Sequence, residues 1–375
     1  MDDTCWRNRF SAVLSATQGG KRVTLIRRNR LAAFICGFWL TFVVLLLVLT
    51  ILVVLHIALG KTMMTPEQVV KALLNRSDDA GMRHIVWNLR LPRVLVATAA
   101  GLMLGLAGAV LQVVLRNPLV EPGLVGATAG CVLFVVLWML YAPVSYNTPK
   151  NLPLVALIGG IITVAAIYFL NGHGENGRAR LALTGVVATA IIQSVTSLLL
   201  LKNQQGLSAI FLWNFGSLNG RVWQHWNIVW PWCLTLIPLT QLYARKARLL
   251  QLEDAVGIGL GLAVNRTRLT LLLLAAALTA AAVSVVGAIG FIGLVGPHIA
   301  ALLVGRNPVH LFPTSALFTA VLLVAADWAA QGITLKLPFP GMEHHVTSLP
   351  VGAVTTIMGA PFFLYLLRKT LVKKR

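Results

Sequence analysis

The stretch that decides the fold is AFICGFWLTFVVLLLVLTILVVLHIAL, residues 33–59, in which no Asp, Glu, Lys or Arg occurs. A helix rises about 1.5 Å per residue, so this run can cross a hydrocarbon core of about 30 Å with some tilt. It is too long for the apolar core of a signal peptide, and no small-residue cleavage site follows it closely. It therefore predicts an uncleaved first membrane span behind a basic tail, residues 1–32.

The composition extends this interpretation to the whole chain of 375 residues. Hydrophobic residues make up 57% and charged residues only 11%, less than half of the roughly 25% usual in soluble domains. We therefore expect an all-α integral membrane protein with about ten transmembrane helices, in one membrane domain at residues 33–370 with a short basic tail at 371–375. The expected spans are residues 33–59, 92–113, 123–141, 151–170, 181–201, 226–244, 269–286, 289–304, 312–332 and 349–367.

The distribution of basic residues predicts the orientation. An even number of spans places both termini on one side, and with that side inside, 21 of the 31 lysines and arginines fall on inner segments and 10 on outer ones. Because basic residues stay on the cytoplasmic side of bacterial spans, both termini are expected to be cytoplasmic. The same rule explains the net charge of +20 without nucleic acid, and the N-terminal basic tail is expected to hold orientation or touch anionic lipid.

Chemistry of the enzyme or metal-site kind finds no support in the sequence. The tripeptide Gly60-Lys61-Thr62 lacks the glycine that a phosphate loop needs five residues earlier, where Leu55 stands. Adjacent His344 and His345 in the outer loop are expected to be solvated rather than metal-bound. The four cysteines show no metal spacing and no disulfide framework; they are Cys5, Cys36, Cys131 and Cys233. We therefore expect no enzyme activity, no cofactor and no metal site.

The strongest motif surrounds the second span. It begins with Arg90-Leu91-Pro92-Arg93 and ends with Arg116-Asn117-Pro118-Leu119 and Glu121-Pro122-Gly123. Proline suits the first turn of a helix, and Gly101 with Gly105 makes a small-xxx-small face for close helix packing. The prolines after this span predict a tight inner turn.

This string, followed by GAIGFIGLVGPH at 287–298, LPVG at 349–352 and GAPFF at 359–363, resembles the FecCD-type permeases of type II ABC importers. That family serves iron–siderophore chelates, haem and cobalamin, and the resemblance covers about residues 85–370. The stretch LWNFGSLNG at 212–220 is most similar to the ferric catecholate branch. The resemblance implies the type II permease fold, a second permease subunit that is identical or paralogous, a cytoplasmic ABC ATPase dimer and a periplasmic binding protein.

The resemblance also implies roles for two sets of residues at the membrane surfaces. Arg90 and Arg93 match arginines that face carboxylates of the binding protein, although ordinary interfacial anchoring explains them too. Gln331 stands at a position where the family often has a further arginine. The loop at residues 245–268 resembles the coupling helices that enter a groove of the ATPase. The alternative is an ordinary solvated loop. Its coupling positions are Asp254, Ala255, Gly257, Leu260 and Gly261.

Four other residues keep two interpretations each. Asn117 and Leu119 match the cytoplasmic gate region, or they only make the turn. Asp327 is an acid inside the ninth span, either a buried structural partner or a proton or cation site. His298 is expected to be structural rather than a haem ligand.

We therefore expect a non-catalytic permease subunit in a bacterial inner membrane that carries an iron–siderophore chelate. The alternatives are haem or cobalamin import and a proton-coupled secondary transporter centred on Asp327.

Overall fold

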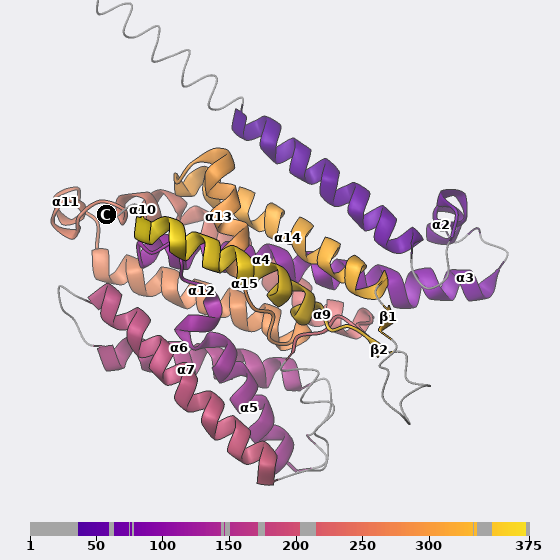
Figure 1. The fold of residues 1–375 in the computed structure, drawn as a ribbon, viewed down its shortest axis with the longest axis horizontal. Coiled ribbons are helices and arrows are strands. Elements are labelled where there is room, and N and C mark those ends of the chain that lie inside the picture. The colour runs from indigo at the N-terminus through magenta and orange to yellow at the C-terminus, as the bar shows by residue number, and fades with distance from the viewer. Residues whose placement is uncertain are drawn as a thin grey trace, which may run out of the picture.

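Long helices make up nearly all of the described chain, and most of them run roughly along one axis (Figure 1). The computed structural model describes residues 37–59, 64–74, 76, 79–143, 146, 151–171, 177–202, 215–332, 334–335 and 347–372. The basic tail 1–32, the Leu212–Asn214 part of the catecholate-like stretch, and the His344–His345 pair lie outside these residues.

Ten helices occupy the ten predicted spans. Seven helical stretches in the described residues are long and apolar enough to cross a membrane, and α5 and α13 are shorter apolar helices. The sixth predicted span is α9, which contains two prolines. The helices are Gly37–Ala58, α4 (Leu91–Val114), α5 (Ala127–Tyr141), α6 (Leu152–Asn171), α7 (Gly177–Lys202), α9 (Trp223–Leu242), α12 (Val264–Val286), α13 (Ile292–Val304), α14 (Pro308–Gly332) and α15 (Val351–Val372).

Short elements gather at the two ends of the long axis (Figure 1). One end carries α10 (Ala244–Leu249) and α11 (Asp254–Gly259), close to the C-terminal end of α15. The other end carries α2 (Pro66–Leu73), α3 (Ala80–His84) and the antiparallel pair β1 (Thr334–Leu335) and β2 (Thr347–Ser348). The 3₁₀ turn η2 (Pro122–Val125) precedes α5.

The second span begins earlier than the sequence predicts. A continuous helical stretch runs from Ala80 to Val114, where the expected start was residue 92. The six residues Ile85–Arg90 form a π-helix, η1, and the N–H of Leu91 bonds to the carbonyl of Val86, five residues back. An α-helical Pro92 would clash with the carbonyl four residues before it, and a π-turn changes that register. The proline therefore follows a widened turn inside the helix rather than starting it.

The core is built around α4, nearly all of which is buried. It packs against α12, α13 and α14, and the small-residue face predicted for it is confirmed. A Cβ at Gly101 would lie 2.5 Å from the Cα of Ala320, and Gly105 faces Ser315 and Thr319, so the backbones of α4 and α14 approach closely. The N-terminal helix, by contrast, lies along the outside of the bundle with most of its apolar surface exposed (Figure 1).

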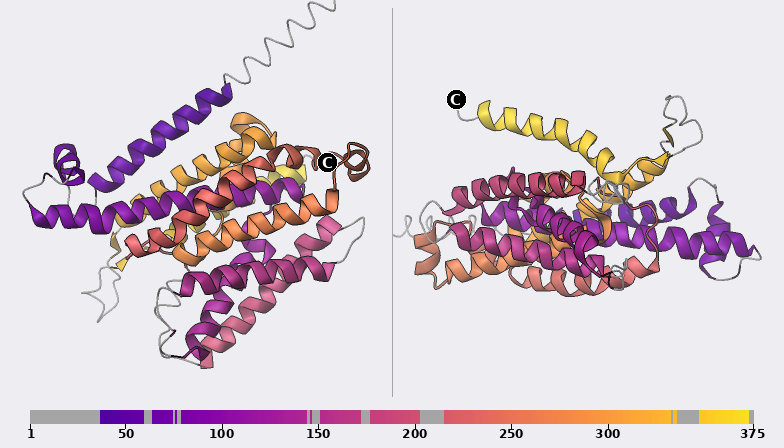
Figure 2. Two further views of the ribbon diagram at one scale, coloured as in Figure 1. Left: turned by 180° about the vertical axis from the view of Figure 1, so that it is seen from behind. Right: turned by 90° about the horizontal axis from the view of Figure 1, so that it is seen from below.

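Helix α15 stands apart from the bundle over much of its length (Figure 2). It packs mainly against α13 and α14. Ile357 and Leu364 on this helix are 71% and 67% exposed, although both are large and apolar. Helix α7 likewise exposes apolar side chains, including Leu198 and Leu201. Lipid or another protein must cover these faces in a membrane.

Candidate functional site

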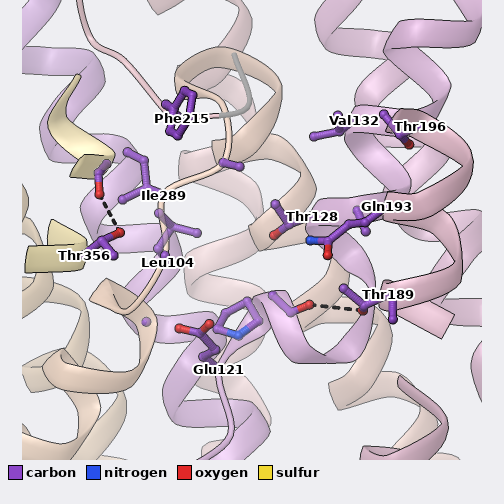
Figure 3. Close-up of a pocket in the computed structure, with 18 of the residues that line it drawn as sticks. Leu104, Glu121, Thr128, Val132, Thr189, Gln193, Thr196, Phe215, Ile289 and Thr356 are labelled. Atoms are coloured by element: carbon purple, nitrogen blue, oxygen red, sulfur yellow. Dashed lines mark hydrogen bonds between the residues drawn. The ribbon is translucent and has the colours of Figure 1, made fainter. Parts of the chain in front are cut away.

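A cavity of about 920 Å³ lies between α5, α7, α15 and the turn that joins α12 to α13. Figure 3 shows Thr128 and Gln193 on one wall, with Phe215 and Thr356 on the other. The polar groups of the wall are hydroxyls and one amide. Glu121 is the one ionisable side chain among the described residues that line the cavity. The wall can therefore contact a large polar molecule without a strong charge, apart from this carboxylate.

Glu121 is fixed by a contact with a distant part of the chain. Its Oε2 accepts a hydrogen bond of 2.8 Å from the backbone N–H of Phe291. Burial raises the pKa of the Glu121 carboxyl, and the bond from Phe291 opposes this increase. In the sequence, Glu121 stands out only as part of a turn motif. Nothing in the local pattern shows that its carboxylate meets a backbone group 170 residues away.

The two predicted gate residues lie just before this carboxylate. Asn117 accepts a hydrogen bond from the N–H of Leu119 at 3.0 Å through its side-chain oxygen, which is a side-chain-stabilised turn. Neither residue is part of the cavity wall, to which this loop contributes Glu121, Pro122 and Gly123. The tight turn is present, and the gating role stays a prediction.

The predicted coupling positions form a short exposed helix at one end of the bundle. Helix α11 starts at Asp254, whose carboxylate pairs with Arg268 at 2.8 Å and Arg116 at 3.4 Å. It ends in a Schellman arrangement, in which the N–H of Leu262 bonds to the carbonyl of Gly257 and Gly261 has φ +78°.

Most side chains of α11 face solvent. Ala255 and Leu260 are exposed, as are Val256 and Ile258, whereas Gly257 is buried. The helix thus has an acidic first residue and ends at a glycine turn. Coupling to an ATPase stays a prediction.

Asp327 is the centre of a buried polar cluster at the opposite end of the bundle. Its Oδ2 lies 2.8 Å from His56 Nε2, and Arg93 donates to both carboxylate oxygens at 2.8 and 2.7 Å. Gln331 donates to the same carboxylate at 3.2 Å. This geometry matches the structural interpretation of Asp327, which is fully buried and not part of the cavity wall.

The two predicted docking arginines are engaged within the chain. Arg90 is 9% exposed and donates to the carbonyls of Ile57 and Ala58 at 2.5 and 3.2 Å, which ties the N-terminal helix to α4. Arg93 forms an ion pair with Asp327. Their geometry explains anchoring of the helices, and docking of a binding protein stays a prediction for both.

Arg221 is a further arginine at this end that sequence reasoning missed. It is partly buried, and its Nε has no hydrogen-bond partner in the described part of the chain. Burial and then the charge of Arg93 lower the pKa of Arg221 to about 10, so it remains charged at neutral pH. Its side chain lies 3.3 Å from His225 and forms no ion pair with a described carboxylate. Because Arg93 is paired with Asp327, Arg221 supplies the excess positive charge of this cluster within the described residues.

Other candidate ligands are dispersed. His298 packs its ring edge-on against Phe362, with ring centroids 5.7 Å apart. Cys131 and Cys233 are free thiols, and within the described ranges no three His, Cys, Asp or Glu side chains form a metal-sized group. The His298 ring is thus positioned as part of helix packing.

Seven helical stretches of the described chain that are long and apolar enough to cross a membrane indicate a multi-pass membrane protein, and comparison with known proteins places it more closely. The FecCD transport family matches residues 45–369, and the chain belongs to this family. The Fe(3+)-citrate import system permease protein YfmE of Bacillus subtilis (strain 168) is 36% identical over 329 residues, which covers 88% of this chain and 95% of that protein.

Two further similarities agree with the family. The achromobactin transport system permease protein CbrC of Dickeya dadantii (strain 3937) is 37% identical over 327 residues, covering 87% of this chain and 90% of that protein. A solved inward-facing structure of a metal-chelate type ABC transporter matches with a TM-score of 0.74 and 25% identity, over 88% of this chain and 98% of that one. The recognised family and the permease fold predicted from the sequence are therefore confirmed, and relatives of this kind are transport permeases rather than enzymes.

Proposed function

We propose that this protein is the transmembrane permease subunit of an ABC importer that carries a ferric siderophore-type chelate from the periplasm to the cytoplasm. The observation that carries the proposal is the cavity of about 920 Å³, whose described wall is uncharged except for Glu121. Its volume is near the upper end of small-molecule sites, which suits a bulky chelate. A wall with few charges lets such a molecule pass without binding tightly. The names of the two relatives, for Fe(3+)-citrate and achromobactin, support iron chelates as the cargo.

ATP hydrolysis belongs, in this proposal, to a partner ABC ATPase dimer that contacts α11. The support is an exposed apolar surface on a short, well-capped helix at one end of the bundle. Val256, Ile258 and Leu260 are 49%, 64% and 59% exposed there. Exposed apolar side chains of this kind mark contact surfaces. The end that carries α10 and α11 is then cytoplasmic, and both chain termini lie on that side of the inner membrane.

A second permease subunit, identical or paralogous, completes the cavity wall. The support is that α7 and α15 both line the cavity and both expose apolar side chains. The opposite end of the bundle meets a periplasmic binding protein. The positive charge of Arg221 there suits acidic side chains of that partner. The permease domain comprises residues 33–370 between the two basic tails.

Of the two alternatives, the proton-coupled carrier fits the geometry less well. A proton-coupled carrier centred on Asp327 needs this acid on the transport path, but its carboxylate is fully buried, bonded to Arg93 and His56, and outside the cavity wall. Import of haem or cobalamin uses the same architecture and differs in cargo alone. Cargo uptake separates it from the proposal.

The test is uptake in a strain that lacks the gene, with and without its restoration, under iron limitation. Ferric citrate, a ferric catecholate and a ferric hydroxamate labelled with radioactive iron are compared with haem and cobalamin. Loss and rescue of one ferric chelate is expected, and it should also require an intact ATPase site in the partner. Uptake that is lost only for haem or cobalamin, or for none of the five, would contradict the proposal.

A further inference from the structure

Two residues of the described chain hold a left-handed backbone conformation without being glycine. They are Arg116, with φ +50°, and Phe291, with φ +63°. A long or aromatic side chain is strained in this region and persists there when surrounding contacts hold it. Both residues are held by contacts of a single segment, the loop at residues 115–121, which we call the inner loop.

Arg116 holds the inner loop to the segment before α11. Its Nε and Nη2 donate to the carbonyl of Leu250 at 3.0 and 2.8 Å, and its Nη2 also lies 3.4 Å from Asp254 Oδ1. Leu250 directly follows α10, so this carbonyl is one of the acceptors that a helix end leaves unpaired. A guanidinium is well suited to such a carbonyl because it adds positive charge at the negative end of the helix.

Glu121 holds the other end of the inner loop to the cavity. Its carboxylate accepts the N–H of Phe291, the residue that begins α13 and that has no cap from its own side chain. A carboxylate at a helix N-terminus is favoured by the helix dipole. The Phe291 ring in turn packs against Gly359 and lies 6.3 Å from the ring of Phe363, both on α15. The inner loop therefore contacts the coupling segment at Arg116 and the start of α13 at Glu121.

We propose that the inner loop is the element that transmits movement of α11 to the cavity wall, with Arg116 and Glu121 as its two positioning residues. This inference rests on the proposed function, because it assigns to ATP hydrolysis in the partner the displacement of α11. One strained residue, Arg116, lies in the loop, and the loop's Glu121 holds the second, Phe291, just before α13. Release of either anchor, Arg116 or Glu121, permits a relaxed backbone, which provides two discrete arrangements rather than a gradual deformation. Displacement of α11 then shifts α13 and, through Phe291, α15.

The experiment measures coupling, which is the number of ATP molecules hydrolysed per ferric chelate taken up. The native complex is purified through a tag on this chain, reconstituted in liposomes, and supplied with its binding protein. Glu121→Ala removes one anchor. Arg116→Gly removes the other while leaving a residue that tolerates φ +50°. Each is expected to raise the ratio about tenfold, which is the low end of what losing a hydrogen bond to a charged group costs.

Matched variants separate transmission from simple structural support. Glu121→Gln keeps an acceptor oxygen and should recover most of the coupling. Arg268→Gln removes the shorter ion pair to Asp254 from α12, outside the inner loop, and should keep the wild-type ratio. Because both anchors serve one link, the Glu121→Ala and Arg116→Gly double variant should be no worse than either single variant.

Each outcome decides one claim. A wild-type complex that hydrolyses ATP without taking up chelate contradicts the proposed function. A coupled wild type with wild-type ratios in both anchor variants overturns the inner-loop inference, as does uptake that falls only with the amount of assembled complex. Should the anchor variants fail to assemble, Arg116→Lys is compared instead, because a lysine cannot make the paired donation to the Leu250 carbonyl. A ratio raised about twofold to threefold supports the link, and an unchanged ratio overturns it.

Discussion

Replacing Asp327 by Asn is expected to destabilise the protein more than any change at an exposed charge. The substitution keeps the size of the side chain and removes its charge. In the folded protein this carboxylate is 1% exposed and accepts two hydrogen bonds from Arg93, which is 16% exposed. His56, 1% exposed, also lies against it at 2.8 Å. The variant therefore leaves a largely buried guanidinium without a counter-charge.

The magnitude follows from that burial. Removing one partner of a buried ion pair costs about 3–5 kcal/mol, because the remaining charge stays away from water without compensation. Arg93 retains some contact with solvent, which places the expected loss near the lower end, about 3 kcal/mol. Converting Arg93 to Gln in the same chain removes the uncompensated charge. The double variant Asp327→Asn/Arg93→Gln should therefore be more stable than Asp327→Asn alone.

The assay is reversible unfolding of the purified chain in mixed micelles, with helix content followed as denaturing detergent increases. Glu67→Gln is the control, since it breaks an ion pair with Lys71 whose side chains are 75% and 57% exposed. That control should leave the transition unchanged. An Asp327→Asn protein with wild-type stability, or a double variant less stable than the single one, would refute the role assigned to the buried cluster.

Four other changes probe separate parts of the structure. Gly101→Val should cost about 1–3 kcal/mol of stability in the same unfolding assay, since its side chain would meet the backbone of α14. Ile258→Asp on α11 should keep the unfolding transition but lower the amount of ATPase that co-purifies. Uptake should decline as the pH falls because Glu121, whose pKa is raised by burial, loses its charge, and it should level off at the slightly lower uptake that Glu121→Gln shows at every pH. Arg221→Glu should weaken binding-protein affinity about tenfold, measured by titration, and the same change at the exposed Arg76 should have little effect.

Much of the fold could be predicted because a membrane helix can be recognised from the local sequence alone. A charge-poor run such as 33–59 must hydrogen-bond its own backbone in lipid, so its length and composition suffice to identify a helix. Gly101 and Gly105 likewise indicate a close contact through their spacing. The start of the second span was wrong by about twelve residues, because a π-turn before Pro92 has no sequence signature that distinguishes it from a helix start.

The polar contacts that organise the candidate site could not be predicted in the same way. His56 and Asp327 are 271 positions apart, and Glu121 and Phe291 are 170 apart. Each pair is brought together by the packing of several helices, and neither member carries a local pattern that names its partner. The left-handed backbone of Arg116 could not be predicted either. No glycine marks the position, and a contact with the carbonyl of Leu250 after α10 holds the residue there.

The most direct test of the central claim is chelate uptake by the purified complex in sealed liposomes, with the binding protein outside and ATP either inside or absent. Ferric citrate labelled with radioactive iron serves as the first cargo, followed by ferric catecholate and hydroxamate chelates. We predict accumulation of one ferric chelate only when ATP is enclosed, with no effect of dissipating the proton gradient. Accumulation of any of these chelates without ATP, driven by an imposed proton gradient, would contradict the account.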